Sequence, residues 1–338
     1  MFMRCEMREI QNKELWESFL LSHSPASLFQ SWPWGEVQRR QGICVWRYGV
    51  FEEGRLSGIV QVSKICAKRG WFLHVRHGPI IGHSQSHLWQ FVMDWLADKA
   101  RKERCWFVRI NPLVEDNSFY RTLFSSLCLL RAAIHAMDGE YCWVLDLDRS
   151  TDEILADMRK STRYEIRRSE KMAIEVVRSD KAKDLAWFMS LYKKTSLRHE
   201  FVPHQGIGEE FSIFARNGQA QLYLARFGGE VLAGALILWY GDQAIYHHGA
   251  SVTSRVPASY AIQWQAILDA KKRGIKLYNF WGIAPEDNIN HPWRGITLFK
   301  KGFGGRISEY IHAHDLPVSP FYQLSRGVET IRRIRKGY

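Results

Sequence analysis

The sequence predicts an α/β protein, of the α+β kind, with two tandem lobes in which helices flank a mixed sheet. Three observations support this. The chain has 338 residues, which is long for a single core. Its 46% hydrophobic and 24% charged residues are typical of a globular protein. Helix and strand patterns also follow one another in a similar order in both halves. We therefore expect lobes at 1–142 and 143–316, with a helix in 317–338 packing on the first lobe.

The first lobe is expected to begin with a helix over 7–24 and a short basic helix opened by two tryptophans in "LFQSWPWGEVQRRQG". The stretch "VWRYGVFEEGRLSGIVQVSKI" predicts two strands joined by the turn "EEGR". A strand in "GWFLHVRHGPII", an amphipathic helix in "HLWQFVMDWLADKARKERC" and a strand in "WFVRINP" follow.

The second lobe repeats this order. One long helix is expected over 152–173 and another in "LAWFMSLYKKTSLRHEF", followed by antiparallel strands between 220 and 251 with turns at "FGGE" and "YGDQ". The helix "ASYAIQWQAILDAKKRG" ends at Gly274, and the strand "IKLYNFWGI" comes next. This order matches the acyltransferase fold of the GNAT superfamily, and the first half resembles a looser copy of it.

Cysteine usage, histidine spacing and hydropathy indicate the cellular compartment and the kinds of site expected for the protein. Six cysteines occur singly, without a CxxC pair, which favours reduced thiols in the cytoplasm. His74, His77 and His83 lack a cysteine or carboxylate pair at ligand spacing, so no metal site is expected. No apolar run reaches the roughly 20 residues that a membrane helix needs. Acidic residues near the N-terminus argue against an export signal.

The net charge of +12 and the pI of about 9.4 indicate a polyanionic partner, or else a protein that is merely basic. Nucleic acid, a phosphate-bearing substrate and an anionic membrane surface all satisfy the first interpretation. The expected helix 152–173 concentrates part of this charge. Arg159, Arg163 and Arg167 recur every four residues beside Lys160, so they form one cationic face. Such a face can be a solvated surface, or it can hold RNA through its phosphates.

A coenzyme A site of the GNAT type is not expected. Enzymes of that superfamily hold the pyrophosphate on a glycine-rich turn at a helix N-terminus. The equivalent stretch is "SVTSRVPASYAIQW", in which Ala258 and Tyr260 replace the glycines and Pro257 lacks an N–H group. We therefore expect an acyl donor other than acyl-CoA.

Six motifs together resemble the FemABX family of peptidoglycan aminoacyltransferases. They are "FQSWPWGEVQRRQG", "MRKSTRYEIRRSEK", "LYKKTSLRHEF", "YHHGAS", "IKLYNFWGI" and "LFKKGFGG", in the family's order over about 29–315. The chain resembles the compact, FemX-like form, without the helical arm of some members. The resemblance implies transfer of an amino acid from aminoacyl-tRNA to an amine of the precursor stem peptide, with no cofactor.

The resemblance also assigns roles to individual residues. It makes Lys300 the catalytic cation that stabilises an oxyanion, with Phe299 as its packing or stacking neighbour, whereas Lys301 would be solvated. The residues implied in precursor binding are Trp34, Gln38, Arg39, Arg198, Tyr246, His248 and Asn111. Gln38 stands where the family has a phosphate-binding lysine, so Arg39 is the alternative, and Asn111 stands where the family often has an acid. Tyr246 and His248 are expected on one face of a strand.

Two other functions stay open from the sequence. One is a GNAT-type N-acyltransferase with an acyl-CoA donor. The other is an RNA-binding or membrane-surface module without catalysis. The basic tail "RGVETIRRIRKGY" is suited to contact with anionic lipid at the cytoplasmic face of a membrane. The sequence does not distinguish a nucleotide-linked from a lipid-linked precursor.

Overall fold

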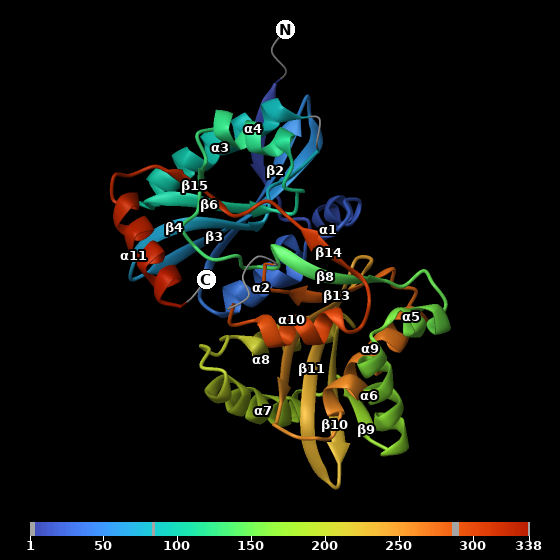
Figure 1. Cartoon of the computed structure of the whole chain (residues 1–338). Helices are drawn as coiled ribbons and strands as arrows, with labels where there is room; N and C mark the ends of the chain where they lie inside the picture. Colours follow the sequence, from blue (N-terminus) through green and yellow to red (C-terminus); the bar gives the residue numbers. More distant parts are fainter. Residues whose placement is uncertain (1–3, 83–84, 286–290, 337–338) are drawn as a thin grey trace. The chain divides into compact units, whose positions relative to one another are not determined.

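The computed structural model describes residues 4–82, 85–285 and 291–336, and the chain divides into two compact units (Figure 1). Unit 1 comprises Met1–Tyr141, Pro285–Pro292 and Glu309–Tyr338, and unit 2 comprises Cys142–Ala284 and Trp293–Ser308. Each unit contains one mixed sheet with helices on its faces, which confirms the predicted fold class.

The sheet of unit 1 has the strand order β1-β2-β3-β4-β6-β15-β7, with β5 paired to β3. Its strands are β1 (Cys5–Glu9), β2 (Cys44–Glu52), β3 (Arg55–Ala67), β4 (Gly70–His77), β5 (Ile80–Ile81), β6 (Phe107–Pro112), β7 (Leu130–Arg131) and β15 (His314–Pro317). The β4–β6 pair is parallel, and the other described pairs of this sheet are antiparallel.

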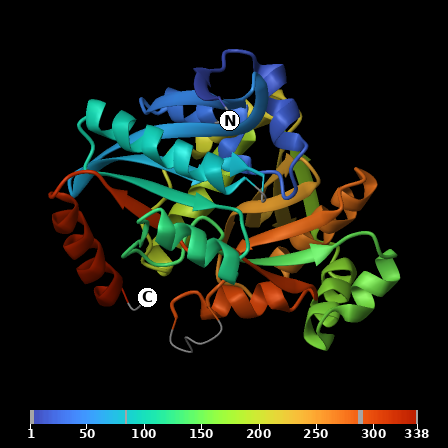
Figure 2. The ribbon, with the colours of Figure 1, turned by 90° about the horizontal axis from the view of Figure 1, so that it is seen from above.

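The two faces of this sheet differ in chemistry. The helices of the unit are α1 (Lys13–Leu21), the 3₁₀ helix η1 (Leu28–Gln30), α2 (Trp32–Arg40), α3 (Ser86–Lys102), α4 (Ser118–Ser126) and α11 (Tyr322–Arg335). An apolar core lies between the sheet and the pair α3 and α4 (Figure 2). On the opposite face, Gln61 donates to the carbonyl of Phe29 in η1, and Arg109 pairs with Glu329 in α11. This second face is therefore held by hydrogen bonds and ion pairs as well as by packing.

The sheet of unit 2 has the order β14-β8-β13-β12-β11-β10-β9. Its strands are β8 (Tyr141–Asp146), β9 (Glu175–Ser179), β10 (Ala220–Phe227), β11 (Glu230–Tyr240), β12 (Gln243–Ser251), β13 (Leu277–Gly282) and β14 (Arg306–Glu309). The pair β12–β13 is parallel and follows the crossover helix α9 (Ala258–Lys272). The other helices are α5 (Thr151–Asp157), α6 (Lys160–Lys171), η2 (Ala182–Asp184), α7 (Leu185–Arg198), α8 (Ile207–Arg216) and α10 (Arg294–Lys301).

The prediction of one long helix over 152–173 is wrong, because the chain breaks between α5 and α6. A capping box at Ser150 and Glu153 begins α5, and Met158 then takes an extended conformation with ψ 150°. Arg159 donates its backbone N–H to the carbonyl of Gly302 at 2.9 Å, so the break is fixed by a distant segment. The apolar positions nevertheless stay on one side, with Met158 and Ile166 both buried.

The first helix also differs from the prediction over 7–24. The chain first forms strand β1, which pairs with β2, and Asn12 then caps α1 by accepting the N–H of Leu15 at 2.9 Å. None of the helices in the described part of the chain has both the length and the apolar character needed to cross a membrane.

Candidate functional site

Lys300 lies in the last turn of α10, and its side chain is buried in unit 2. The residue is 6% exposed, and Nζ donates a hydrogen bond to the carbonyl of Gly282 at 2.5 Å. Lys301 is half-buried, and its ammonium lies 5.1 Å from the centroid of the Trp143 ring. The segment is helical, and successive helical side chains are about 100° apart, so the two lysines have separate surroundings.

The surroundings of Lys300 leave its charge weakly compensated. Burial lowers the pKa of Lys300 to about 8. Burial also raises the pKa of the neighbouring Cys142 thiol to about 12, so this thiol is neutral at physiological pH. Within 4–82, 85–285 and 291–336, no carboxylate forms an ion pair with Lys300. An ammonium held only by a carbonyl interacts strongly with an anion that develops beside it.

The acceptor of this hydrogen bond is positioned by an irregularity in β13. The register between β13 and β8 shifts between Asn279 and Gly282. Trp281 has a φ of +68°, and its N–H is satisfied by the side-chain oxygen of Asn279 at 2.8 Å. Such backbone conformations are costly for a side chain as large as tryptophan. Sequence reasoning missed this kink, because period-two alternation does not report a local change of register.

Two further features hold α10 against the sheet. Gly305 has a φ of +93°, and a Cβ at this position would lie 2.2 Å from the carbonyl oxygen of Val144. Only glycine therefore permits this approach to β8. On the helix, the ring of Phe299 lies 5.1 Å from that of Tyr260 and 5.2 Å from that of Phe303. Phe299 thus packs into the core of unit 2 and supports the position of Lys300.

A bulge in β12 brings two histidines to one carboxylate. Tyr246 and His248 pair with consecutive residues of β11, so His247 is the extra residue of the bulge. The prediction that Tyr246 and His248 share a face is therefore wrong. His247 Nδ1 lies 2.7 Å from one oxygen of Glu210, and His248 Nε2 lies 3.1 Å from the other.

This histidine–glutamate cluster can hold charge or a metal ion. Burial alone would raise the pKa of Glu210, but His247 and His248 outweigh it and hold the pKa well below the usual range. The ligand atoms of the three residues all lie within 4.8 Å of one another. Two imidazoles and a carboxylate form a donor set that suits Zn²⁺ and similar divalent metals. The cluster was missed in the sequence because Glu210 is distant from the "YHHGAS" motif.

Asn111, in β6 of unit 1, lies beside a buried carboxylate. Its Nδ2 donates to Asp138 Oδ2 at 3.2 Å, and Arg76 Nε donates to the same oxygen at 3.1 Å. Burial would raise the pKa of Asp138, but Arg76 and the nearby histidines outweigh it and hold the pKa well below the usual range. Asn111 therefore has a carboxylate beside it, and this carboxylate comes from a loop 27 residues further along the chain.

The other expected residues of unit 1 lie on or beside α2. Trp34 is buried at 8% exposure. Gln38 is also buried, and its Oε1 accepts a hydrogen bond from Ser63 Oγ at 2.8 Å. The side chain of Arg39 is 42% exposed and pairs with Glu36 at 3.1 Å. Of the two candidates for the lysine position, Arg39 offers a surface charge, whereas Gln38 is used within the unit.

The expected cations of unit 2 have different partners. Arg198, at the end of α7, is exposed, and Nη1 donates to Thr253 Oγ1 at 3.2 Å. Arg163 donates to the carbonyl of Ala156 at 2.8 Å and so caps the end of α5.

The remaining members of the cationic face are at the surface. Arg159 is exposed and lies 3.5 Å from the carbonyl of Leu298. Lys160 and Arg167 are exposed, and within the described part of the chain neither forms an ion pair. Lys171, at the end of α6, is likewise exposed and forms no ion pair among the described residues, so these three lysine and arginine side chains carry the unpaired charge of the helix.

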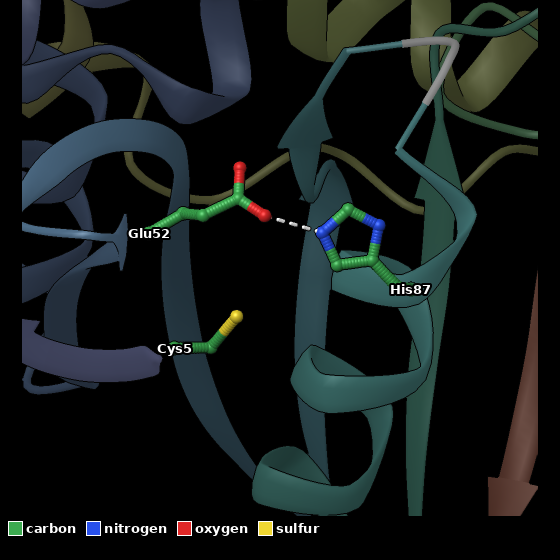
Figure 3. Close-up of side chains that lie close together, drawn as sticks. All are labelled: Cys5, Glu52 and His87. Carbon is green, nitrogen blue, oxygen red and sulfur yellow. Dashed lines mark hydrogen bonds and ion pairs between the residues drawn. The ribbon is translucent and has the colours of Figure 1, made fainter. Parts of the chain in front are cut away.

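A second group of possible metal ligands lies at the edge of the sheet in unit 1 (Figure 3). Cys5 and Glu52 are direct partners in the β1–β2 ladder, and Glu52 Oε1 lies 2.5 Å from His87 Nε2 at the start of α3. Burial, followed by Glu52 and Glu53, raises the pKa of the Cys5 thiol. His87 is largely exposed, so this group is more open to solvent than the histidine–glutamate cluster.

The three histidines considered as ligands from the sequence have other surroundings. Burial lowers the pKa of His74 to about 3, so this side chain is neutral at physiological pH. His77 Nε2 lies 2.5 Å from the backbone carbonyl of Asp138. His83 lies outside the described residues.

Comparison with known proteins identifies the family. The model of the FemAB family matches residues 11–122, 131–206 and 209–330. The chain therefore belongs to the FemAB family, and it is an acyltransferase. It is 21% identical to a protein named lipid II:glycine glycyltransferase from Staphylococcus haemolyticus, over 96% of each chain. That alignment spans 403 positions, more than the 338 residues here, so the relative contains segments that this chain lacks.

Solved structures support the fold. A structure described as FemX superimposes with a TM-score of 0.83 at 19% identity, covering 94% of this chain and 99% of the other. A tandem GNAT protein from the clavulanic acid biosynthesis pathway gives a TM-score of 0.61 at 12% identity, over 94% and 99% of the two chains. The predicted pair of GNAT-like lobes is thus confirmed.

Proposed function

We propose that this chain transfers an amino acid from aminoacyl-tRNA to an amine of a lipid-linked peptidoglycan precursor at the cytoplasmic face of the membrane. The names of the relatives, which specify lipid II as acceptor and glycine as the transferred residue, support the reaction class. The single observation that carries the proposal is the burial of Lys300 with a carbonyl as its hydrogen-bond partner. The resemblance assigns the catalytic cation to this same position.

The chemistry requires orientation and charge stabilisation more than a covalent intermediate. The acceptor amine attacks the ester carbonyl, a C–N bond forms, and the carbonyl oxygen becomes an oxyanion. The ammonium of Lys300 stabilises this charge, and it does so strongly because water is excluded from it. The C–O bond to the ribose then breaks, and the proton lost by the amine is taken up by the ribose oxygen. A pKa of about 8 allows Lys300 to pass a proton between these groups near neutral pH.

The donor is proposed to lie along the exposed cations of α6. Lys160 and Arg167 provide point charges for RNA phosphates, and Arg159, the N-cap residue of α6, is exposed as well. Arg163 contributes mainly to the α5 end, because its guanidinium is bonded to backbone carbonyls there. Recognition of the donor would then depend on phosphate position and would be sensitive to salt.

Candidate acceptor-binding groups can be named in each unit separately. Arg39 and Arg198 are exposed cations of the kind that bind diphosphate, and Trp34 and Asn111 lie in unit 1 near the Arg76–Asp138 pair. In unit 2, His248 belongs to the histidine–glutamate cluster, and Tyr246 lies on the other face of β12.

A transfer assay tests the proposal. Charged tRNAs are mixed with the chain and with a lipid-linked or a UDP-linked precursor, and mass spectrometry follows the product. We expect an increase of one amino-acid residue in the lipid-linked precursor, loss of the product in Lys300→Met, and near-normal product in Lys301→Met. Equal turnover by Lys300→Met and the wild type would exclude the proposed role of Lys300.

Transfer from acyl-CoA is the second candidate, because the fold is shared with GNAT proteins. The start of α9 argues against it. Pro257 has no N–H group, and the N–H of Ala258 is directed to the carbonyl of Val256 at 2.9 Å. Fewer donors therefore face a pyrophosphate at this helix end. Calorimetric titration with coenzyme A should show no saturable binding, and micromolar affinity would favour this second function.

A further inference from the structure

In helix α11 polar side chains face the sheet and the aliphatic side chains face outward. Its residues that face the sheet of unit 1 are polar or amphipathic: Tyr322, Ser325 and Glu329 are 1%, 0% and 4% exposed. The aliphatic residues face outward, at spacings of three or four residues. Their exposed fractions are 60% for Leu324, 42% for Val328, 53% for Ile331 and 67% for Ile334, and Phe321, just before the helix, is 56% exposed. We call these five residues the α11 stripe.

The inward face explains why this orientation is stable. Glu329 accepts hydrogen bonds from Arg109 at 2.7 and 3.0 Å and from Arg69 at 2.9 Å. Ser325 donates to the carbonyl of Arg69, and the Tyr322 ring packs against Phe107 at 5.2 Å. Rotating the helix to bury the stripe would leave the buried Arg109 and the half-buried Arg69 without this carboxylate. The ion pairs therefore hold the apolar stripe in solvent.

Basic residues surround the stripe. Within α11 and its C-cap the cations are Arg326, Arg332, Arg333, Arg335 and Lys336, and the helix has one acid, the buried Glu329. Beside Val328, the side chains of Lys68, Arg69 and Arg332 line an open depression. Cations next to an exposed aliphatic side chain match a phosphate head group next to an acyl chain.

We propose that the α11 stripe and its flanking cations dock the protein on an anionic phospholipid bilayer, with the helix parallel to the membrane surface. In both views α11 lies along the margin of its own unit (Figure 1, Figure 2). A nucleic acid would use the cations and leave five apolar side chains in water, whereas a bilayer uses both. This inference depends only on the geometry of unit 1, and it accords with a lipid-linked acceptor.

Vesicle sedimentation with the full chain tests this docking. The wild type is mixed with vesicles of phosphatidylglycerol and phosphatidylcholine, or of phosphatidylcholine alone. We expect binding to the anionic vesicles that weakens as salt is raised, and little binding to the neutral ones. The variant Leu324→Ser/Ile331→Ser/Ile334→Ser should bind at least about 100-fold more weakly, because three aliphatic anchors are lost.

A matched control distinguishes the stripe from general hydrophobicity. The variant Leu15→Ser/Leu21→Ser/Leu197→Ser removes three exposed leucines elsewhere, and it should bind vesicles as the wild type does. The α11 variant should keep the wild-type melting temperature and the wild-type rate of transfer to a lipid-linked precursor presented in detergent micelles without vesicles, which separates docking from the proposed reaction.

Three results would overturn the docking proposal. The first is equal vesicle binding by the α11 variant and the wild type. The second is a wild-type dimer, seen by analytical ultracentrifugation, that the α11 substitutions abolish while vesicles are not bound. The third is binding of tRNA, but not of vesicles, that depends on the stripe.

Discussion

Arg109 of unit 1 and Lys300 of unit 2 are both buried cations, and the difference between them distinguishes a structural charge from one to which we propose a catalytic role. Arg109 is 2% exposed and lies between Asp315 and Glu329, with four hydrogen bonds of 2.7 to 3.0 Å. Burial would lower its pKa, but the two carboxylates outweigh burial and raise it. Lys300 is 6% exposed, has a carbonyl as its partner, and has a lowered pKa.

This difference has a physical consequence. A buried cation with matched anions repays its desolvation through local pairing and holds elements together. A buried cation without an anion destabilises the folded state, and the missing interaction can be provided by a negative charge that appears during a reaction. The same substitution at both positions should therefore have opposite effects on stability.

The largest effect is expected at the structural cation. Arg109→Met leaves Asp315 without its main partner and weakens the attachment of Glu329 in α11. We expect a loss of about 3–5 kcal/mol in the free energy of unfolding, measured by chemical denaturation at pH 7. The control is Arg168→Met, whose pair with Glu165 is partly exposed at 33% and 24% and should contribute about 1 kcal/mol or less. Similar losses in the two variants would contradict the comparison.

The second-largest effect is expected on the transfer rate. Lys300→Met should lower the transfer rate by about 10²- to 10³-fold, because the oxyanion loses its charged partner. Stopped assays with saturating donor and acceptor measure this rate. Lys301→Met is the matched control, since its ammonium contacts an aromatic ring rather than the Gly282 carbonyl. A larger loss in Lys301→Met would move the catalytic role to the neighbouring residue.

The third prediction concerns the free energy of unfolding, which replacement by methionine should raise at Lys300 although it lowers it at Arg109. The pKa of Lys300 is about 8 when folded and 10.5 when exposed, so the unfolded chain binds more protons between these pH values. The contribution of Lys300 to stability therefore rises with pH in that window. Relative to Lys300→Met, the wild type should be less stable by up to about 3 kcal/mol at pH 7, a difference that diminishes toward pH 10.5. Denaturation of both proteins at pH 7 and above 9 tests this.

A constant difference between wild type and Lys300→Met across this pH range would show that the lysine is not desolvated in the folded chain. The Arg109 pair provides a reference, because its guanidinium stays charged throughout.

The smallest effect is expected for exposed cations, which are buried neither against carboxylates, as Arg109 is, nor against a carbonyl, as Lys300 is. Lys160→Ala/Arg167→Ala should weaken tRNA binding and reduce the slope of log affinity against log salt by about 1.5, since two phosphate contacts are lost. Filter binding at several salt concentrations measures the slope. The double variant should unfold as the wild type does, whereas Arg163→Ala should also destabilise the end of α5. An unchanged slope would place the donor elsewhere.

Much of the fold could be predicted because its signals are local. Alternating apolar residues predicted β2 and β3 around their turn, and Gly274 was correctly expected to end α9. The break between α5 and α6 could not be predicted, since it depends on the Gly302 carbonyl, more than 140 residues away. A motif placed Lys300 among the candidate residues, and its site role stays a prediction, whereas the buried carboxylates of Asp138 and Glu210 were missed because distant segments bring them to Asn111 and to the two histidines.

By itself the sequence determined the order of helices and strands, the family motifs and the place of Lys300 among them, because these are recorded in local spacing and residue type. Tertiary structure alone decided how each charge is used. Whether a cation is buried against two carboxylates, as Arg109 is, or against one carbonyl, as Lys300 is, depends on segments that are distant in the chain. It also decided that α11 turns its aliphatic residues outward, because the buried Arg109 and the half-buried Arg69 pair with Glu329 on the inner face.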